Sequence, residues 1–264
     1  MTGALEVRLR ARRDAGRKLL VPYVTGGYPA DWGRVIEAVV AAGADAVEIG
    51  IPFSDPVMDG PTIQEASVLA LEAGATPPSV IDAVAELDVE APLAVMTYYN
   101  ICFRMGHRRF AAALRQAGIA AAILPDLPLE EAGPWTEAAD AEGVETVLLA
   151  APTAPDDRLP RIAARSRGFV YGVGLLGTTG ERDALADSAM VMARRLKAVT
   201  DKPVLIGIGV STPDQAAELA SVADGVVVGS ALVRRLLDGG GPDAAAAFVA
   251  ELRAGLDSVT AAAP

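Results

Sequence analysis

Short apolar runs and longer amphipathic stretches alternate along the whole chain. The apolar runs are rich in Val, Ile and Leu and are not broken by regular polar positions. This pattern predicts strands that are buried on both faces of a parallel sheet. We expect strands at Leu19–Val24, Ala46–Ile51, Leu93–Tyr98, Ala121–Pro125, Glu145–Ala150, Phe169–Val173, Pro203–Ile208 and Gly225–Gly229.

The stretches between these runs repeat apolar residues at helical spacing, which predicts helices with one buried face. We expect helices at Trp32–Ala42, Thr62–Ala73, Pro78–Leu87, Arg108–Ala117, Glu130–Ala141, Ala189–Val199 and Pro213–Ala220, and one more from Leu5 to Lys18 before the first strand.

Eight strand–helix units in 264 residues predict an α/β fold of the (β/α)8 type, a TIM barrel. No linker interrupts the pattern, so we expect a single domain over residues 1–264 with an extra N-terminal helix. A doubly wound open sheet is the structural alternative, but no Gly-x-Gly-x-x-Gly follows the first strand to favour it.

Composition narrows the class of partner and the compartment. The formal net charge is −11, and no cluster of Lys and Arg is flanked by aromatic residues, which argues against nucleic acid or an anionic membrane as the partner. No run of about eighteen residues is free of both charge and proline, so we expect no membrane helix. Cys102 is the only cysteine. A chain that cannot form an intrachain disulfide fits a reducing, cytoplasmic setting.

Three acids surround the end of the second predicted strand. Glu48 interrupts the apolar run around it, while Asp55 and Asp59 lie in the following Pro/Gly-rich loop. Burying a carboxylate without a partner is costly, so Glu48 is expected to be either paired or catalytic. Asp59 is a second catalytic candidate, although it could equally form a turn or cap the next helix. Asp55, between Ser54 and Pro56, has the strongest turn character of the three.

Glycines follow the last two predicted strands, in Gly207-Ile208-Gly209 and in Gly229-Ser230. At these points of a barrel, glycines let backbone N–H groups at helix N-termini approach an anion closely. The pattern therefore predicts a phosphorylated small-molecule ligand. The alternative is that these glycines only form tight turns.

Residue types that other barrel chemistries need are missing from the strand ends. A Schiff-base aldolase needs a lysine there, but the chain's three lysines precede strands or lie in a helix: Lys18, Lys197 and Lys202. His107 is the only histidine, at the expected start of a surface helix, so we expect no metal site. Acid–base chemistry by carboxylates remains. Hydroxyl groups near the strand ends come from Tyr98, Tyr99 and Tyr171, each of which could equally be a packing residue.

Five motifs spread over nearly the full length resemble the tryptophan synthase alpha subunit family. They are Val21–Gly27, Pro-Phe-Ser-Asp-Pro-x-x-Asp-Gly-Pro-Thr-Ile-Gln at residues 52–64, Leu124–Pro128, Gly177–Gly180 and Gly229-Ser230, and the second is highly specific. The resemblance implies cleavage of indole-3-glycerol phosphate to indole and glyceraldehyde 3-phosphate by a retro-aldol step, without a cofactor. It also implies a pyridoxal-phosphate beta subunit as partner, in an alpha2beta2 complex.

The same resemblance implies roles for individual residues. Glu48 takes the position of the acid that moves protons between the indole C3 and the glycerol hydroxyl. Asp59 takes that of the carboxylate that binds the indole N–H, and Tyr171 that of an active-site tyrosine. The implied phosphate-binding positions are Gly180, Gly209, Gly229 and Ser230. The implied indole pocket is Tyr23, Met96, Ile123 and Ile208. The implied partner loop contains Pro52, Asp55 and Pro56.

The chain departs from the family pattern at the lid loop that precedes Gly180 and beside the indole pocket. Gly174 is additional and should loosen the lid, Thr178 replaces the usual Val, and Ile208 replaces a common Phe. Two other functions stay open: a stand-alone lyase that is fast without a partner, and a non-catalytic barrel that binds phosphate ligands or activates a partner. The presence of both acids argues against the non-catalytic reading. A phosphosugar isomerase would rest on fold analogy alone.

Overall fold

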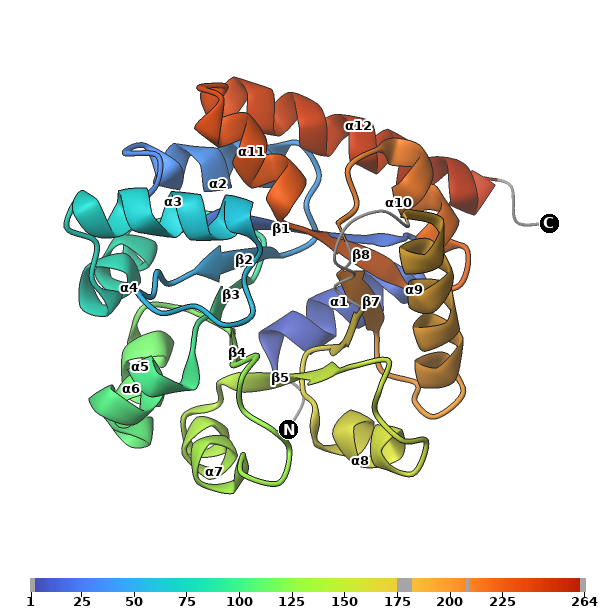
Figure 1. The fold of residues 1–264 in the computed structure, drawn as a ribbon, viewed down its shortest axis with the longest axis horizontal. Helices are drawn as coiled ribbons and strands as arrows, with labels where there is room; N and C mark the ends of the chain where they lie inside the picture. Colours follow the sequence, from blue (N-terminus) through green and yellow to red (C-terminus); the bar gives the residue numbers. More distant parts are fainter. Residues whose placement is uncertain (1–2, 175–181, 208, 262–264) are drawn as a thin grey trace.

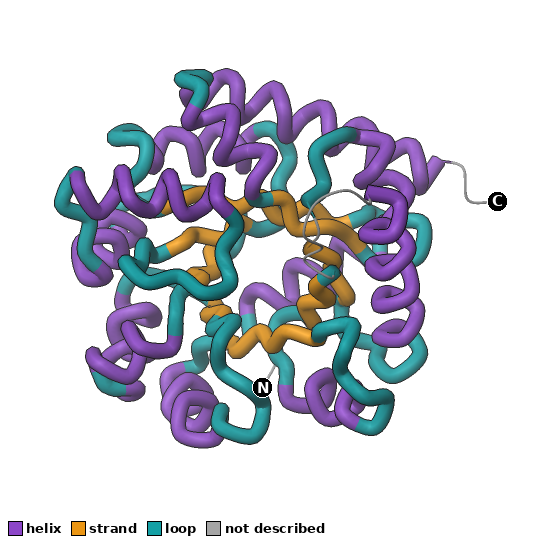
Figure 2. Tube along the Cα trace, viewed as in Figure 1, coloured by secondary structure: helices purple, strands orange, loops and turns teal. Residues whose placement is uncertain are grey.

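The computed structural model describes residues 3–174, 182–207 and 209–261. Eight parallel strands form a closed barrel in which each strand pairs with the next and β8 pairs with β1 (Figures 1 and 2). This confirms the TIM barrel expected from the sequence. The strands are β1 (Leu19–Thr25), β2 (Val47–Gly50), β3 (Leu93–Met96), β4 (Ala121–Ile123), β5 (Glu145–Ala150), β6 (Val170–Val173), β7 (Val204–Gly207) and β8 (Gly225–Val228).

Helices surround the barrel on its outside, except for α1, which lies across its N-terminal end (Figure 1). They are α1 (Ala4–Asp14), α2 (Trp32–Ala41), α3 (Pro61–Glu72), α4 (Pro77–Ala85), α5 (Tyr99–Met105), α6 (His107–Gln116), α7 (Gly133–Glu142), α8 (Arg158–Arg165), α9 (Arg182–Lys197), α10 (Pro213–Ala220), α11 (Ser230–Leu237) and α12 (Gly241–Ala261). In the described part of the chain no single helix is long and apolar enough to cross a membrane. Helices α3 and α4 taken together reach the length and composition of a membrane span, but they are bent by 90° relative to each other.

Every predicted helix has a counterpart in the structure. Some predicted boundaries were wrong, and some helices were not predicted. The first helix ends at Asp14 instead of Lys18, because Gly16 adopts a φ of 84°, the left-handed conformation that ends helices. Helix α8 was not predicted, and it contains Pro160 in its first turn, where proline is tolerated. Helices α5 and α12 were also not predicted.

Inward-facing residues of the strands fill the lower part of the barrel, and α1 closes its N-terminal end. Leu5 and Leu9 of α1 are fully buried and pack with barrel residues such as Phe169 and Leu205. The carboxylate of Glu145, at the start of β5, accepts hydrogen bonds from the N–H groups of Leu5 at 2.8 Å and Glu6 at 3.1 Å. With this end closed, the C-terminal ends of the strands form the accessible side of the barrel.

Two more buried acids sit at the N-terminal ends of strands, and both are fully engaged. Asp45, just before β2, pairs with Arg17 at 2.9 Å and Arg253 at 3.3 Å and accepts the Leu20 N–H at 2.9 Å. Asp224, just before β8, pairs with Lys197 at 2.8 Å and also accepts a backbone N–H of β7. Acids bonded in this way tie strands and helices together at the closed end.

Candidate active site

Glu48 projects from β2 into the barrel, where one oxygen of its carboxyl group has no hydrogen-bond partner among the described residues. It lies in register with Tyr23 of β1 and Ala94 of β3, and it is 1% exposed. Its buried oxygen Oε2 accepts no hydrogen bond from the residues that the structure describes. Burial, together with the nearby carboxylate of Asp59, raises the pKa of Glu48 to about 8. Near neutral pH such a group can both give and take a proton.

Asp59 lies in the loop between β2 and α3, on the C-terminal side of Glu48. Burial raises its pKa, and a hydrogen bond from the Tyr98 hydroxyl opposes that rise. The N-cap of α3 is Gly60, with no side-chain cap, so the capping role considered for Asp59 is not adopted. The Tyr98 hydroxyl also accepts hydrogen bonds from the N–H groups of Met58 at 2.8 Å and Asp59 at 3.1 Å. Tyr98 therefore fixes the loop that carries Asp59.

Two tyrosine side chains enter the barrel where a glycine on the neighbouring strand leaves room. A Cβ at Gly50 would lie 1.8 Å from the Tyr23 hydroxyl oxygen, and one at Gly207 would lie 2.4 Å from the Tyr171 ring. Both tyrosines are buried, and desolvation is the largest cause that raises the pKa of each. The charge of Glu48 raises both pKa values as well, and for Tyr171 it is the second-largest cause. The barrel therefore brings Tyr23, Glu48 and Tyr171 together.

Tyr99 does not join this group. Its hydroxyl lies 2.9 Å from Nε2 of His107, and the two rings stack. Its N–H donates to Asp126 at 2.8 Å. The hydroxyl of Tyr99 is thus committed to helix α6, and His107 acts as its partner.

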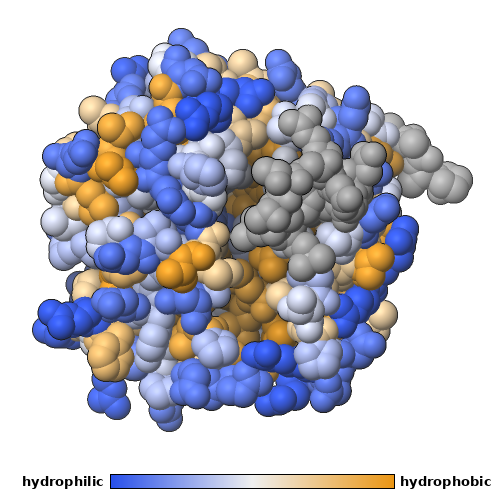
Figure 3. Space-filling model, in the orientation of Figure 1, coloured by the Kyte–Doolittle hydropathy of each residue, from blue (hydrophilic) through white to orange (hydrophobic). Residues whose placement is uncertain are grey.

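Apolar side chains line the barrel beside the two acids. Met96 of β3 and Ile123 of β4 are register partners that face inward, and Met96 also packs with Tyr23. Figure 3 shows a hollow on this face of the molecule with hydrophobic side chains at its floor. The predicted pocket residue Ile208 lies outside the described residues.

Among the predicted phosphate positions that the structure describes, those at the N-terminus of α11 have backbone N–H groups without a side-chain cap. Helix α11 starts at Ser230 after Gly229 and has no side-chain cap, so its first N–H groups are free to bind a ligand. In contrast, Thr212 caps α10 by accepting the Gln215 N–H at 3.3 Å. Gly209 adopts a φ of +49°, and a Cβ there would meet no atom of the described residues within 4 Å. Gly180, like most of the predicted lid that follows Gly174, lies outside the described residues.

The predicted partner loop exposes apolar side chains that the sequence interpretation did not single out. Asp55 is exposed and Pro56 is half-buried, whereas Pro52 is buried. Val57 is 78% exposed and Met58 is 41% exposed. An apolar pair within a Pro/Gly-rich loop was the available signal, since such loops are usually polar.

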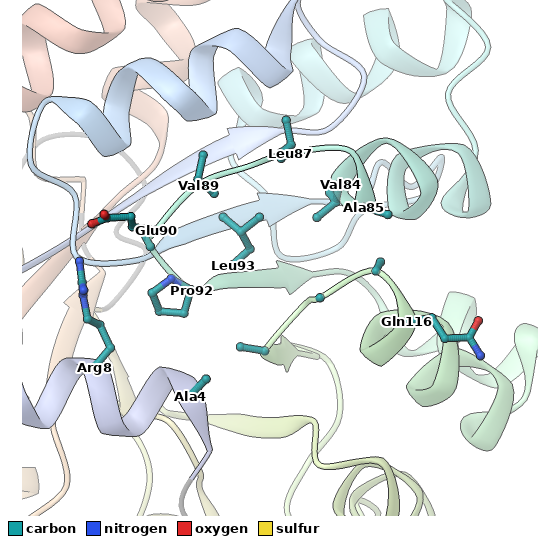
Figure 4. Close-up of a pocket in the computed structure, with 14 residues that line it drawn as sticks. Ala4, Arg8, Val84, Ala85, Leu87, Val89, Glu90, Pro92, Leu93 and Gln116 are labelled. Carbon is teal, nitrogen blue, oxygen red and sulfur yellow. The ribbon is translucent and has the colours of Figure 1, made fainter.

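A separate cavity of about 450 Å³ lies at the opposite, N-terminal end of the barrel (Figure 4). It is bounded by α1 and by the segments that lead into β3 and β4, including Arg8, Glu90 and Gln116. None of the predicted site residues lines it. Among the described residues there is also no group of three or more His, Cys, Asp or Glu that could hold a metal ion.

Comparisons with known proteins identify the family of this chain. The family model described as tryptophan synthase alpha chain matches residues 9–259. A tryptophan synthase alpha chain from Thermobifida fusca (strain YX) is 45% identical over 262 residues, covering 96% of this chain and 97% of the relative. One from Streptomyces coelicolor is 48% identical over 243 residues, covering 90% and 89%.

Solved structures show the same similarity. A Mycobacterium tuberculosis tryptophan synthase structure matches with a TM-score of 0.89 and 37% identity, covering 97% of this chain and 99% of that chain. Tryptophan synthase subunit alpha from Legionella pneumophila matches with a TM-score of 0.88 and 30% identity, covering 98% and 100%. On the family match, the sequence identity and the shared barrel, this chain belongs to the tryptophan synthase alpha chain family, whose members are enzymes of tryptophan biosynthesis.

Proposed function

We propose that this chain is a carbon–carbon lyase that cleaves indole-3-glycerol phosphate to indole and glyceraldehyde 3-phosphate. The observation that carries the proposal is the state of Glu48: a buried carboxyl whose Oε2 has no hydrogen-bond partner in the described part of the chain, near Asp59 at the accessible end of the barrel. A structural acid in that place would be expected to have partners. An acid with a pKa of about 8 suits proton transfer near neutral pH.

The chemistry needs one proton to arrive and one to leave. Protonated Glu48 gives its proton to C3 of the indole, which turns the ring into an electron sink. The carboxylate then takes the proton of the hydroxyl on the adjoining carbon of the glycerol chain. The bond between the two carbons breaks, its electrons return to the ring, and indole and an aldehyde form.

Asp59 supports the positive charge that develops on the ring. As a carboxylate it accepts a hydrogen bond from the indole N–H and stabilises the protonated intermediate. The hydrogen bond from Tyr98 favours its ionised form. We therefore assign the neutral acid at the start to Glu48, with its pKa of about 8, and the carboxylate to Asp59, where the Tyr98 hydrogen bond opposes the rise that burial causes.

The remaining parts of the substrate have matching surfaces. The indole ring fits among Tyr23, Met96 and Ile123, with Ile208 as a further candidate. The phosphate fits the uncapped N-terminus of α11 at Gly229 and Ser230, close to the open backbone of Gly209. Tyr171 packs beside Glu48 in the barrel. Gly180 completes the phosphate-binding positions that we propose.

We also propose a tryptophan synthase beta subunit as the partner, docking on the loop that contains Pro52, Asp55 and Pro56. The exposed side chains of Val57 and Met58 support this, and so does Phe103 of α5, which is 63% exposed. Apolar groups that stay exposed on a monomer favour an interface at that place.

The test is indole release from indole-3-glycerol phosphate by the purified chain, alone and with a tryptophan synthase beta subunit. Slow release that rises strongly with the beta subunit would establish an alpha subunit. Fast release without a partner would instead support a stand-alone lyase. No release in either case would contradict the proposed activity.

A further inference from the structure

Tyr23 carries a hydroxyl group deep in the indole pocket, where the sequence assigned only an apolar lining. Its side chain is 8% exposed and packs against Ile63 and Met96. A phenylalanine would fill the same space with the same ring. A buried hydroxyl is costly unless it has a hydrogen-bond partner, and the polar side chains that act on this one include Asp59, Thr25 and Glu48.

The surroundings of Tyr23 place the hydroxyl next to Glu48. The two residues are register partners on adjacent parallel strands, so their side chains enter the barrel side by side. The hydroxyl reaches Gly50, the next inward-facing position of β2, and would collide there with any Cβ. It therefore lies just on the C-terminal side of Glu48, on the path between Glu48 and the loop of Asp59.

Glu48 lacks the hydrogen-bond donor that its ionised form needs. Its Oε2 is buried and accepts no hydrogen bond from the described residues. Titratable groups that face it are Asp59 from the loop, Tyr23 from β1 and Tyr171 from β6. Tyr23 is the tyrosine in this set whose pKa is raised by both acids. Thr25 is a competing partner for its hydroxyl, but the Thr25 hydroxyl is buried without a hydrogen bond of normal geometry.

We propose that Tyr23 is a positioning residue whose hydroxyl donates a hydrogen bond to the Glu48 carboxylate once Glu48 has passed its proton to the substrate. The bond stabilises the ionised acid during the interval before it accepts the glycerol hydroxyl proton. Gly50 is the structural requirement for this role, because it leaves the space that the hydroxyl occupies. This inference rests on the lyase activity proposed above.

The test compares Tyr23→Phe with Tyr99→Phe, a matched removal of a hydroxyl that is committed to His107. We expect Tyr23→Phe to lower kcat about tenfold with little change in KM, because one hydrogen bond to a charged group is lost only after proton transfer. We also expect the alkaline limb of the kcat/KM profile to move up by about half to one pH unit, because the ionised form of Glu48 loses a donor. Tyr99→Phe should change neither quantity.

Replacing Tyr23 by a fluorotyrosine, which is a stronger hydrogen-bond donor, should move the alkaline limb in the opposite direction. Thermal unfolding of each variant checks that the fold is intact. An unchanged kcat and an unchanged limb in Tyr23→Phe would overturn the inference, and so would a change in KM alone. If the unmodified chain releases no indole, the lyase proposal fails. If the unmodified chain releases indole and Tyr23→Phe changes neither kcat nor the alkaline limb, only the present inference fails.

Discussion

Buried acids occur at both ends of the barrel, but they differ in their hydrogen-bond and ion-pair partners. At the closed end, Asp45, Glu145 and Asp224 each accept hydrogen bonds from backbone N–H groups, and Asp45 and Asp224 also pair with cations. At the accessible end, the Oε2 atom of Glu48 has no partner among the residues that the structure describes, and the charged group that acts on it is the like charge of Asp59. The first group binds the fold together, whereas Glu48 is left free to exchange a proton.

The comparison shows that burial alone does not identify a catalytic acid. Glu145 and Glu48 are both almost completely buried. Glu145 is the first residue of an apolar strand, and Glu48 interrupts one. What distinguishes them is the supply of donors and the end of the strand on which each lies. The pKa of Glu145 is raised by burial but is held down by the N–H groups of α1, while nothing of that kind acts on Glu48.

The largest effect is expected for Glu48→Gln. Gln has nearly the same shape but cannot transfer the proton, so we expect turnover to fall by about 10³-fold or more, within the range for general acid–base groups. Binding of a phosphate ligand such as glycerol 3-phosphate should stay nearly unchanged. Steady-state indole release measures the first quantity and calorimetry the second. A variant that kept a tenth of the activity would remove Glu48 from the mechanism.

The opposite result is expected for Asp45→Asn at the closed end. Loss of this charge removes the carboxylate partner of Arg17 and leaves Arg253 with only the exposed Asp257, so we expect the free energy of unfolding to fall by about 2–4 kcal/mol, since Arg17 is partly exposed. The kcat of the folded variant should change little. Urea unfolding is the measurement, with Asp201→Asn as a control because Asp201 is an exposed acid with arginine partners. Equal stability of the two variants would contradict a structural role for Asp45.

The pH dependence of stability should also separate Glu48 from the bonded acids. The folded protein keeps the Glu48 proton up to a pKa of about 8, whereas the unfolded chain loses it near the ordinary value of 4.5. Between these values the folded state binds more protons, so this residue makes stability fall as pH rises. From pH 5.5 to 7.0 the protein should lose about 2 kcal/mol relative to Glu48→Gln. Parallel curves from urea unfolding at the two pH values would show that Glu48 has an ordinary pKa.

A smaller effect at the accessible end is expected for Gly209→Val. A side chain at this position would obstruct phosphate approach, so we expect KM to rise about tenfold with little change in kcat. Gly74→Val is the matched control, because Gly74 also has a positive φ and open surroundings but lies at the end of α3. If both variants show the same KM, the phosphate does not bind near Gly209.

Much of the fold could be predicted from the sequence because local pattern and global architecture agree. The apolar runs set the strands, and their number and spacing set the barrel. The missed helices show the limit of this approach. Helix α8 was not predicted, and it contains Pro160 in its first turn, where proline is tolerated. The positive φ of Gly16 ends α1 earlier than its composition suggests.

The candidate site was predictable only as a set of residues. Glu48 and Asp59 could be selected from their positions at a strand end, but the absence of a partner for Glu48 depends on contacts between strands distant in sequence. The contribution of Tyr98 to the Asp59 loop and the space that Gly50 leaves for Tyr23 are likewise tertiary facts. Likewise, the sequence pointed to both α10 and α11 for the phosphate, and only the side-chain cap on α10 favours α11.

The most direct test is the titration of the Glu48 carboxyl group itself in the free protein. Carbon-13 NMR of the labelled glutamate side chains, with the Glu48 signal assigned from its loss in Glu48→Gln, gives the midpoint without any need for turnover. The unpaired state of this acid requires a midpoint near 8, far above the ordinary value. A midpoint near 4.5 would mean that Glu48 has found partners in solution, and the contrast between the two ends of the barrel would no longer explain catalysis.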